Sequence, residues 1–233
     1  MLEALGRQQE VILASRGFCG NNGDVAYLSI FFTSMLVALS GAMMPGPLLT
    51  INISESVRRG ATAGPLLMAG HALLELLLVV ALMLGLSPLF KNDLFFVFVA
   101  LAGGATMLWM ALGMFRSLPT LTVNNGVAVE RKNNLMVAGA LMSLANPYWI
   151  IWWATIGIAY ITRCQKMGFT AVGVFYSGHI FGDVLWYVAI SIAIAKGRRL
   201  FTDRTYQVLI GCCGAFLVAF AGYLLYSGIA KLR

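Results

Sequence analysis

GATAGPLLMAGHALLELLLVVA, residues 60–81, is an apolar stretch that returns later in the chain as GFTAVGVFYSGHIFGDVLWYVA, residues 168–189. At a shift of 108 residues the two stretches share eight identities in twenty-two positions. Matches among Leu, Val and Ala would follow from apolar composition alone. The placement of the only two histidines would not, because each follows a glycine and stands four residues before an acid: His71 before Glu75, and His179 before Asp183. We infer that the chain contains an internal repeat.

The composition is that of an integral membrane protein. Of the 233 residues, 60% are hydrophobic and 11% are charged, and the mean hydropathy is +0.83. An ordinary soluble domain is about 45–50% apolar and about 25% charged, and a globular fold of this length cannot cover so much apolar surface. The four cysteines lack the spacing of a disulfide scaffold, and the hydrophobicity excludes disorder.

The formal net charge is +7, from 16 Lys and Arg against 9 Asp and Glu. Basic residues of membrane proteins gather in loops that face anionic lipid headgroups. The sequence has no basic run with interleaved aromatic residues, so we expect the lipid bilayer as a partner and no nucleic acid.

Six stretches reach the roughly 20 apolar residues that a spanning helix needs. They predict an all-α polytopic membrane protein with six transmembrane helices. Polar residues or Pro and Gly separate the stretches, and we expect the first gap to be a loop at residues 54–60. The predicted spans are 25–48, 64–88, 94–116, 135–160, 168–195 and 206–230.

The repeat extends over three helices in each unit. Pro45 matches Pro147 at a shift of 102, and Gly113 matches Gly222 at a shift of 109. Because each unit holds an odd number of helices, the second copy must enter the membrane upside down, and such inverted repeats are typical of transporters with a binding site between them near the midplane. The expected organisation is an N-terminal extension (1–24), a first repeat (25–118), a connecting loop (119–134) and a second repeat (135–233).

The two His-x-x-x-acid pairs are the first candidates for function. Residues four apart share a helix face, so His71 and Glu75 point the same way, as do His179 and Asp183. An ionised carboxylate in hydrocarbon costs at least ~2.5 kcal/mol, and intramembrane ionisable residues are functional by default. We expect a site for protons or for a substrate ammonium group. The structural alternative is a pair of neutral, hydrogen-bonded acids that lock the helices together.

Two proline motifs are the second candidates. Pro45-Gly46-Pro47 lies late in the first span and Asn146-Pro147 lies within the fourth, and proline removes a backbone donor and clashes with the preceding turn. Both helices are therefore expected to break. The start of a half-helix suits a carboxylate, and freed carbonyls suit an ammonium group. The alternative is a plain proline kink, which is common in spanning helices.

Two further groups follow these motifs. Asn52, Ser54 and Glu55 come after the first break, and we expect them to cap a helix or to lie in a solvated loop. An aromatic group follows the second break, and we expect most of it to belong to the interfacial belt, with one ring available to stack on a substrate cation. Its members are Tyr148, Trp149, Trp152 and Trp153.

The chain has no motif of a known catalytic site, so we expect neither an enzyme nor a cofactor.

The chain resembles the LysE/RhtB family of bacterial amino-acid exporters over residues 25–233. Four features carry the resemblance: Pro45-Gly46-Pro47, the Gly60…Gly70…acid stretch, Asn146-Pro147 and Gly178…Asp183. The resemblance implies proton-driven export of amino acids or close derivatives across the bacterial inner membrane. It also implies that the two proline motifs form a broken-helix site around Glu75 and Asp183. The two histidines and the N-terminal extension are not features of the family pattern.

Two other functions fit parts of the pattern. The first is a divalent metal-ion transporter, in which His71, Glu75, His179 and Asp183 supply two imidazoles and two carboxylates to Zn²⁺, Ni²⁺ or Co²⁺. The second is a membrane scaffold that transports nothing. Small residues at 101–105 and 211–215 allow close helix packing, either within the monomer or in a homodimer.

Overall fold

The computed structural model describes residues 23–90, 92–122, 134–197 and 202–232. Throughout these ranges the secondary structure is helical, with turns and short connections and no strand. Residues 1–22 of the predicted extension and residues 123–133 of the predicted connecting loop lie outside the described residues.

The helices of the described chain include five that are long and apolar enough to cross a membrane. A sixth span results when α7 and the helices after it, which meet at a 63° bend, are counted as one. This agrees with the predicted all-α membrane protein. The helices are α2 (Gly23–Ala42), α3 (Pro47–Arg59), α4 (Ala63–Ala81), α5 (Ser87–Phe90), α6 (Asp93–Ser117), α7 (Leu135–Leu144), α8 (Pro147–Trp152), α9 (Ile158–Gln165), α10 (Phe169–Gly197) and α11 (Asp203–Ala230).

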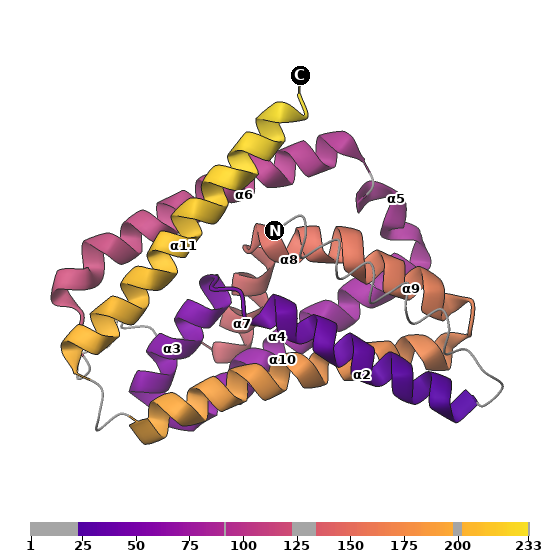
Figure 1. The fold of residues 1–233 in the computed structure, drawn as a ribbon, viewed down its shortest axis with the longest axis horizontal. Helices are drawn as coiled ribbons and strands as arrows, with labels where there is room; N and C mark the ends of the chain where they lie inside the picture. The colour runs from indigo at the N-terminus through magenta and orange to yellow at the C-terminus, as the bar shows by residue number, and fades with distance from the viewer. Residues whose placement is uncertain (1–22, 91, 123–133, 198–201, 233) are drawn as a thin grey trace.

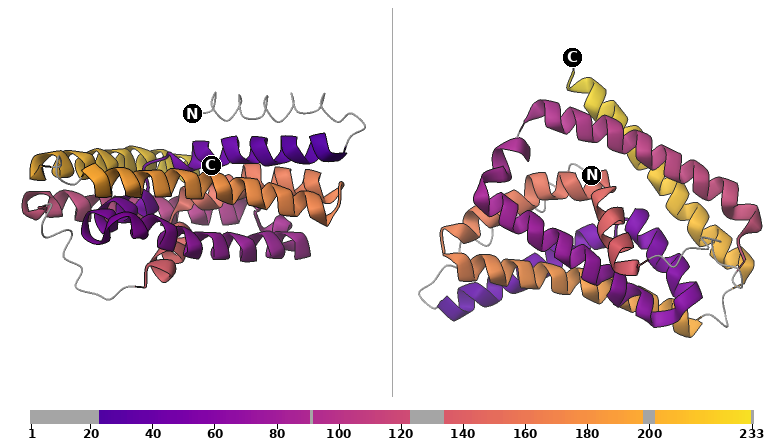
Figure 2. Two further views of the ribbon diagram at one scale, coloured as in Figure 1. Left: turned by 90° about the horizontal axis from the view of Figure 1, so that it is seen from below. Right: turned by 180° about the vertical axis from the view of Figure 1, so that it is seen from behind.

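Three helix pairs organise the molecule. Helix α6 lies alongside α11 on one side, and α2 lies alongside α10 on another (Figure 1), with the same pairs visible from behind (Figure 2). Helix α4 packs on α7. The short helices α3 and α7 lie between these long ones (Figure 1). The first helix of each predicted repeat thus packs on the second helix of the other.

Two glycines at matched positions of the repeat allow these contacts. A Cβ on Gly70 of α4 would collide with the backbone of Met136 in α7, and a Cβ on Gly178 of α10 would collide with the backbone of Phe31 in α2. Backbones approach this closely only where a side chain is absent, as in the small-residue interfaces of membrane helices. Each glycine directly precedes a histidine, so the close approach also fixes where that histidine lies.

The loop predicted at residues 54–60 is wrong, because α3 continues as helix to Arg59. The polar side chains of Asn52, Ser54, Glu55 and Ser56 are buried, and their hydrogen bonds and ion pairs remove the need for a solvated loop, while Arg58 and Arg59 are exposed. Asn52 donates from Nδ2 to the Tyr187 carbonyl at 3.1 Å and accepts from the Ser191 hydroxyl at 2.8 Å. The turn into α4 occurs at Gly60, where φ is +76°, a conformation that glycine adopts without a steric penalty.

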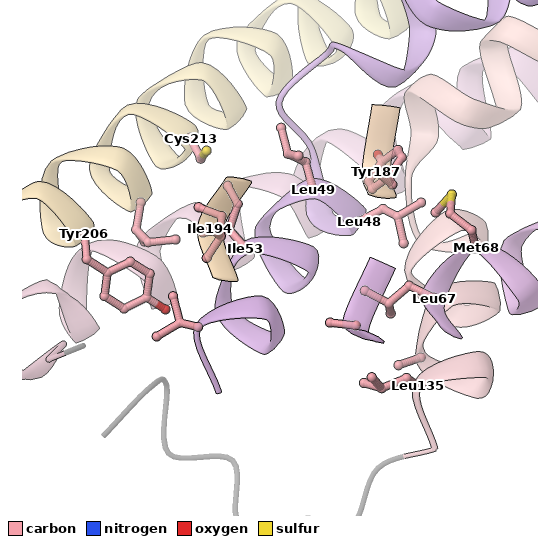
Figure 3. Packing of buried hydrophobic residues seen from close by; sticks show 14 of the residues in the cluster. Leu48, Leu49, Ile53, Leu67, Met68, Leu135, Tyr187, Ile194, Tyr206 and Cys213 are labelled. Atoms are coloured by element: carbon pink, nitrogen blue, oxygen red, sulfur yellow. The ribbon is translucent and has the colours of Figure 1, made fainter. Parts of the chain in front are cut away.

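Apolar packing holds α3 and α4 against their neighbours. Figure 3 shows buried side chains from α3 and α4 together with those of α7, α10 and α11. Leu49 and Ile53 of α3 belong to the same buried cluster as Ile194 of α10 and Cys213 of α11. In a bilayer such contacts stabilise helix packing through van der Waals interactions, so α3 is a packed part of the fold even though its sequence is polar.

Candidate functional site

The two His-x-x-x-acid pairs meet in one buried cluster. Nε2 of His71 lies 3.2 Å from Oε1 of Glu75 and 3.4 Å from Oδ2 of Asp183. Nε2 of His179 lies 3.1 Å from Oε2 of Glu75 and 3.3 Å from Oδ2 of Asp183. Each imidazole therefore contacts the acid of its own helix and the acid of the other helix, and all four residues are buried.

Helix geometry accounts for this arrangement. The four-residue spacing puts each histidine and its acid on one face of α4 or α10. The two helices pack together where Gly64 of α4 leaves room for Ser191 and the Tyr187 carbonyl of α10. The two polar faces then point at each other across the interface.

Glu75 is held by two tryptophans that belong to the aromatic group expected mostly in the interfacial belt. The indole N–H groups of Trp149 and Trp153 donate to its Oε1 at 2.7 and 2.9 Å. The belt assignment is wrong for Trp152 and Trp153, which are buried. A sequence signal was present, because Trp149 and Trp153 are four residues apart and share a face. The π-helical turn Trp153–Gly157 lies at the same place, and such turns are frequent at functional sites.

His71 has a fixed hydrogen-bond partner on its other ring nitrogen. Its Nδ1 lies 2.7 Å from the Ser143 hydroxyl, which itself donates to the Gly139 carbonyl at 2.8 Å. With the hydroxyl hydrogen directed at Gly139, Nδ1 of His71 is the donor to Ser143. The Nε2 contacts with Glu75 and Asp183 then require a further proton between imidazole and carboxylate, because two lone pairs repel each other. The cluster therefore holds at least one exchangeable proton.

The Asp183 side has fewer partners. Within the described part of the chain, Oδ2 of Asp183 contacts only the two imidazoles, and Nδ1 of His179 is buried without a hydrogen-bond partner. The ring of Trp152 lies on His179, with 4.6 Å between ring centroids, and its own indole N–H is also buried and unpaired.

A cavity opens beside the cluster and reaches both proline motifs. It holds about 450 Å³ of space that no atom fills. Ala42 and Leu48 line it from either side of the first break, and Asn146 and Tyr148 line it at the second. Its remaining lining residues are Ala38, Gly41, His71, Glu75, Ser143, Trp149, Trp152, His179, Asp183 and Tyr187.

The proline motifs themselves are divided between two cavities and the core. Pro45 and Gly46 line a smaller cavity of about 200 Å³, which shares Asn146 with the larger one. A Cβ on Gly46 would lie 3.3 Å from Nδ2 of Asn146, so the two motifs are neighbours in space. Pro47 and Pro147 are buried at the first positions of α3 and α8 and line neither cavity.

Two other groups lie away from the cluster. Glu55 is buried on α3 and pairs with Arg58 at 3.2 Å and with Arg59 at 2.6 Å, and the expectation that it lies in a solvated loop is wrong. Of the small residues at 101–105 and 211–215, Gly103 packs within the chain against Pro147 and Gly214 against Phe115.

The cluster also offers the atoms of a metal site. His71, Glu75 and Asp183 present ligand atoms within 4.8 Å of one another, a nitrogen and oxygen set that suits divalent ions such as Zn²⁺. Two indole donors already use Oε1 of Glu75, and they compete for its lone pairs with any cation, whether a metal ion or an ammonium group.

Comparison with known proteins identifies the family. A model of the LysE type translocator family matches residues 39–228. The chain is 21% identical to the putative amino acid efflux protein YcgF of Bacillus subtilis, over 88% of this chain and 99% of that protein. It is 26% identical to the chemotactic transduction protein ChpE of Pseudomonas aeruginosa (85% and 98%) and 26% identical to the threonine efflux protein of Escherichia coli K12 (86% and 99%). No solved structure matches the chain.

The match covers both proline motifs and both His-x-x-x-acid pairs. It confirms the resemblance that the proline motifs, the glycines and the two acids carry. The functions named for the relatives do not favour metal transport. The chain belongs to the LysE type translocator family and is a membrane transporter, not an enzyme.

Proposed function

We propose that this protein exports amino acids or close derivatives from the bacterial cytoplasm across the inner membrane, in exchange for protons. The transport site is the cavity beside His71, Glu75, His179 and Asp183, between two inverted three-helix repeats. The names of two relatives support amino-acid export. The reciprocal packing of α2 on α10 and of α7 on α4 supports the inverted repeat.

The observation that carries the proposal is that each imidazole contacts both carboxylates. With both histidines protonated and both acids ionised, the cluster is neutral. A substrate ammonium group that binds to Glu75 and Asp183 comes to lie next to the two protonated imidazoles that contact the same carboxylates, and like charges repel strongly in a region of low dielectric. A proton then leaves one imidazole, which couples substrate binding to proton release.

The broken helices give this exchange a route. Helix α2 ends at Ala42 and α3 begins at Pro47, while α7 ends at Leu144 and α8 begins at Pro147. Both interruptions border the cavity, and unwound segments at a central site are typical of transporters whose two repeats move against each other. Glycines of the small-residue stretches pack within the chain, while Ala102, Ala105, Cys212 and Ala215 are exposed and are the residues that the homodimer expected as an alternative would bury.

The test is proton movement in proteoliposomes that contain an internal pH-sensitive dye, under an imposed pH gradient. A panel of amino acids is added first, followed by a panel of divalent metals. We expect amino acids to trigger proton flux in the wild type. Glu75→Gln and Asp183→Asn should reduce the flux to below about a tenth while the folded protein stays in the membrane.

Asp93→Asn is the matched control, because Asp93 is an exposed acid at the start of α6 whose partner is Lys231. It should leave the flux unchanged. Normal transport by both Glu75→Gln and Asp183→Asn would show that the cluster does not couple transport to protons. Flux triggered by metals alone would replace amino-acid export with metal transport and make the two histidines ligands.

A further inference from the structure

Trp152 carries a buried hydrogen-bond donor that nothing in the described chain satisfies. The residue is 5% exposed, and its indole Nε1 has no hydrogen-bond partner. Leaving a buried donor unpaired costs about 1–3 kcal/mol, so such a group at a cavity points to a ligand that supplies the missing acceptor. The other two tryptophans of this segment, Trp149 and Trp153, already donate to Glu75.

The space in front of this donor is open because Gly41 has no side chain. A Cβ on Gly41 would lie 3.5 Å from Nε1 and 3.6 Å from Cδ1 of Trp152, so this glycine faces the edge of the indole that carries the N–H. Gly41 and Trp152 both line the large cavity. An acceptor that enters the cavity next to Gly41 therefore reaches the indole hydrogen.

The start of α3 borders the same cavity at Leu48 and carries uncapped backbone N–H groups. Leu48 lines the cavity, and the first intrahelical bond of α3 is donated by Thr50 to Gly46 at 3.0 Å. The N–H groups of Leu48 and Leu49 precede that bond, and no side chain caps them. The start of a helix carries unpaired N–H groups and a positive partial charge, and α3, with 13 residues, is long enough for this effect.

His179 contributes on the same wall. Its ring lies on the ring of Trp152, its Nε2 contacts both acids, and its Nδ1 is buried and unpaired. When the ring is protonated, both of its nitrogens are donors. One side of the cavity thus presents donors and positive partial charge, while Glu75 and Asp183 present negative charge.

We propose that Trp152 and the start of α3 bind the α-carboxylate of the substrate, while Glu75 and Asp183 take its ammonium group. The proposal rests on the transport function proposed above and narrows its substrate class. The ammonium and carboxylate groups of an α-amino acid are attached to one carbon. The cavity offers acceptors for the ammonium group on one side and donors for the carboxylate on the other. The recognised class is then the free α-amino acid, and amines without a carboxylate bind more weakly.

Trp152→Phe is the variant that tests this site, because it keeps an aromatic ring beside His179 and removes the N–H together with the five-membered ring that carries it, and the amine probes report any general effect of the smaller ring. Binding is titrated calorimetrically with purified protein in detergent. The probes are threonine, leucine and phenylalanine, each beside the amine that lacks its carboxylate: 1-aminopropan-2-ol, 3-methylbutylamine and 2-phenylethylamine. A hydrogen bond to a charged group predicts that Kd for the amino acid rises roughly ten- to hundredfold, while Kd for the amine stays the same.

Trp186→Phe is the matched control. The indole Nε1 of Trp186 on α10 is also buried and unpaired, but the residue does not line the cavity, so neither Kd should change. If Trp152→Phe does not fold, Gly41→Ser replaces it. The added Cβ makes ordinary contacts with Trp152, and the hydroxyl occupies the place of the carboxylate, so we expect the same selective loss of amino-acid affinity.

The outcomes separate the two proposals. If the wild type binds amino acids and the variant at Trp152 or Gly41 binds them equally well, the carboxylate site is wrong and amino-acid export stands. The carboxylate site is also wrong if amino acid and amine lose affinity together, since the variant then disturbs the whole cavity. If the wild type binds no amino acid of the panel, the proposed transport function itself fails.

Discussion

The two acids occupy matched positions in the repeated sequence, yet their surroundings differ. Glu75 accepts from two indole N–H groups and contacts both imidazoles, and its own histidine, His71, is backed by Ser143. Within the described residues, Oδ2 of Asp183 contacts the two imidazoles and accepts from no indole, and Nδ1 of His179 has no hydrogen-bond partner. One acid is therefore anchored by the two indoles, and the other, which lacks such donors among the described residues, is the free one.

The difference originates in the helices that carry the proline motifs. At the shift of 102 that aligns Pro45 with Pro147, Ser143 corresponds to Gly41, Trp149 to Pro47, and Trp153 to Ile51. The second copy of the motif thus supplies three polar side chains where the first supplies none. The repeat places the two acids at equivalent positions. Differences between the residues around them give each acid different hydrogen-bond partners.

The close helix packing at Gly70 and Gly178, which the two halves share, should be the feature most sensitive to substitution. In Gly70→Ala and Gly178→Ala the new methyl group would collide with the backbones of Met136 and Phe31. Overpacking a well-packed site costs about 1–3 kcal/mol, and a collision between backbones that cannot rotate away exceeds that range. We expect both variants to lose folded protein, measured as the monodisperse peak in size-exclusion chromatography after detergent extraction.

Gly173→Ala on α10 and Gly113→Ala on α6 are the controls, because a Cβ at either position meets nothing within 4 Å. They should behave as the wild type. If Gly70→Ala remained fully folded and Gly178→Ala did not, the two halves would not share this packing.

The anchored acid should matter more for stability than the free one. Removing one partner of a buried charge pair costs about 3–5 kcal/mol, and Glu75→Ala leaves the indole donors of Trp149 and Trp153 unpaired as well. Asp183→Ala leaves only imidazoles without a partner. We expect the apparent melting temperature in detergent to fall by about 10 °C in Glu75→Ala and by clearly less in Asp183→Ala. Equal falls would contradict the assignment of one anchored and one free acid.

Much of this fold could be predicted because membrane-spanning helices appear in the sequence as long apolar stretches. The lengths of the apolar stretches indicated the spans, and the unusual pairing of His71 and His179 with acids pointed to the residues that the structure brings together. Helix periodicity places each histidine and its acid on one face of a helix. In an apolar medium, packing two such faces together allows the four polar side chains to pair with one another.

The remainder depended on tertiary contacts. Asn52 and Glu55 look like loop residues in sequence, and only the partners on α10 and within α3 explain why they are buried. In the sequence, Trp149 and Trp153 look like interfacial aromatic residues. Only the structure shows that the buried carboxylate of Glu75 points toward them and accepts from both indole N–H groups. Polarity predicts exposure on average, and it fails where polar groups satisfy one another.

Removing a single indole donor should have a smaller effect than removing the acid. Trp149→Phe and Trp153→Phe each delete one of the two N–H groups that reach Oε1 of Glu75, and a hydrogen bond to a charged group contributes about 1.5–3 kcal/mol. We expect each variant to melt a few degrees lower and the double variant to approach the stability of Glu75→Ala. Trp109→Phe, at a side chain 74% exposed on α6, is the control that should not change.

The smallest loss of stability should come from removing the hydrogen bond between Ser143 and His71. Ser143→Ala removes the acceptor 2.7 Å from Nδ1, which costs about 1 kcal/mol for a neutral hydrogen bond and makes His71 resemble His179. The melting temperature should then fall by only about 2–4 °C. Because Nδ1 no longer holds the ring in one orientation, the proton flux triggered by amino acids should change its dependence on pH, measured in the same proteoliposomes. An unchanged pH profile would mean that the asymmetry between the histidines supports the fold and plays no part in proton exchange.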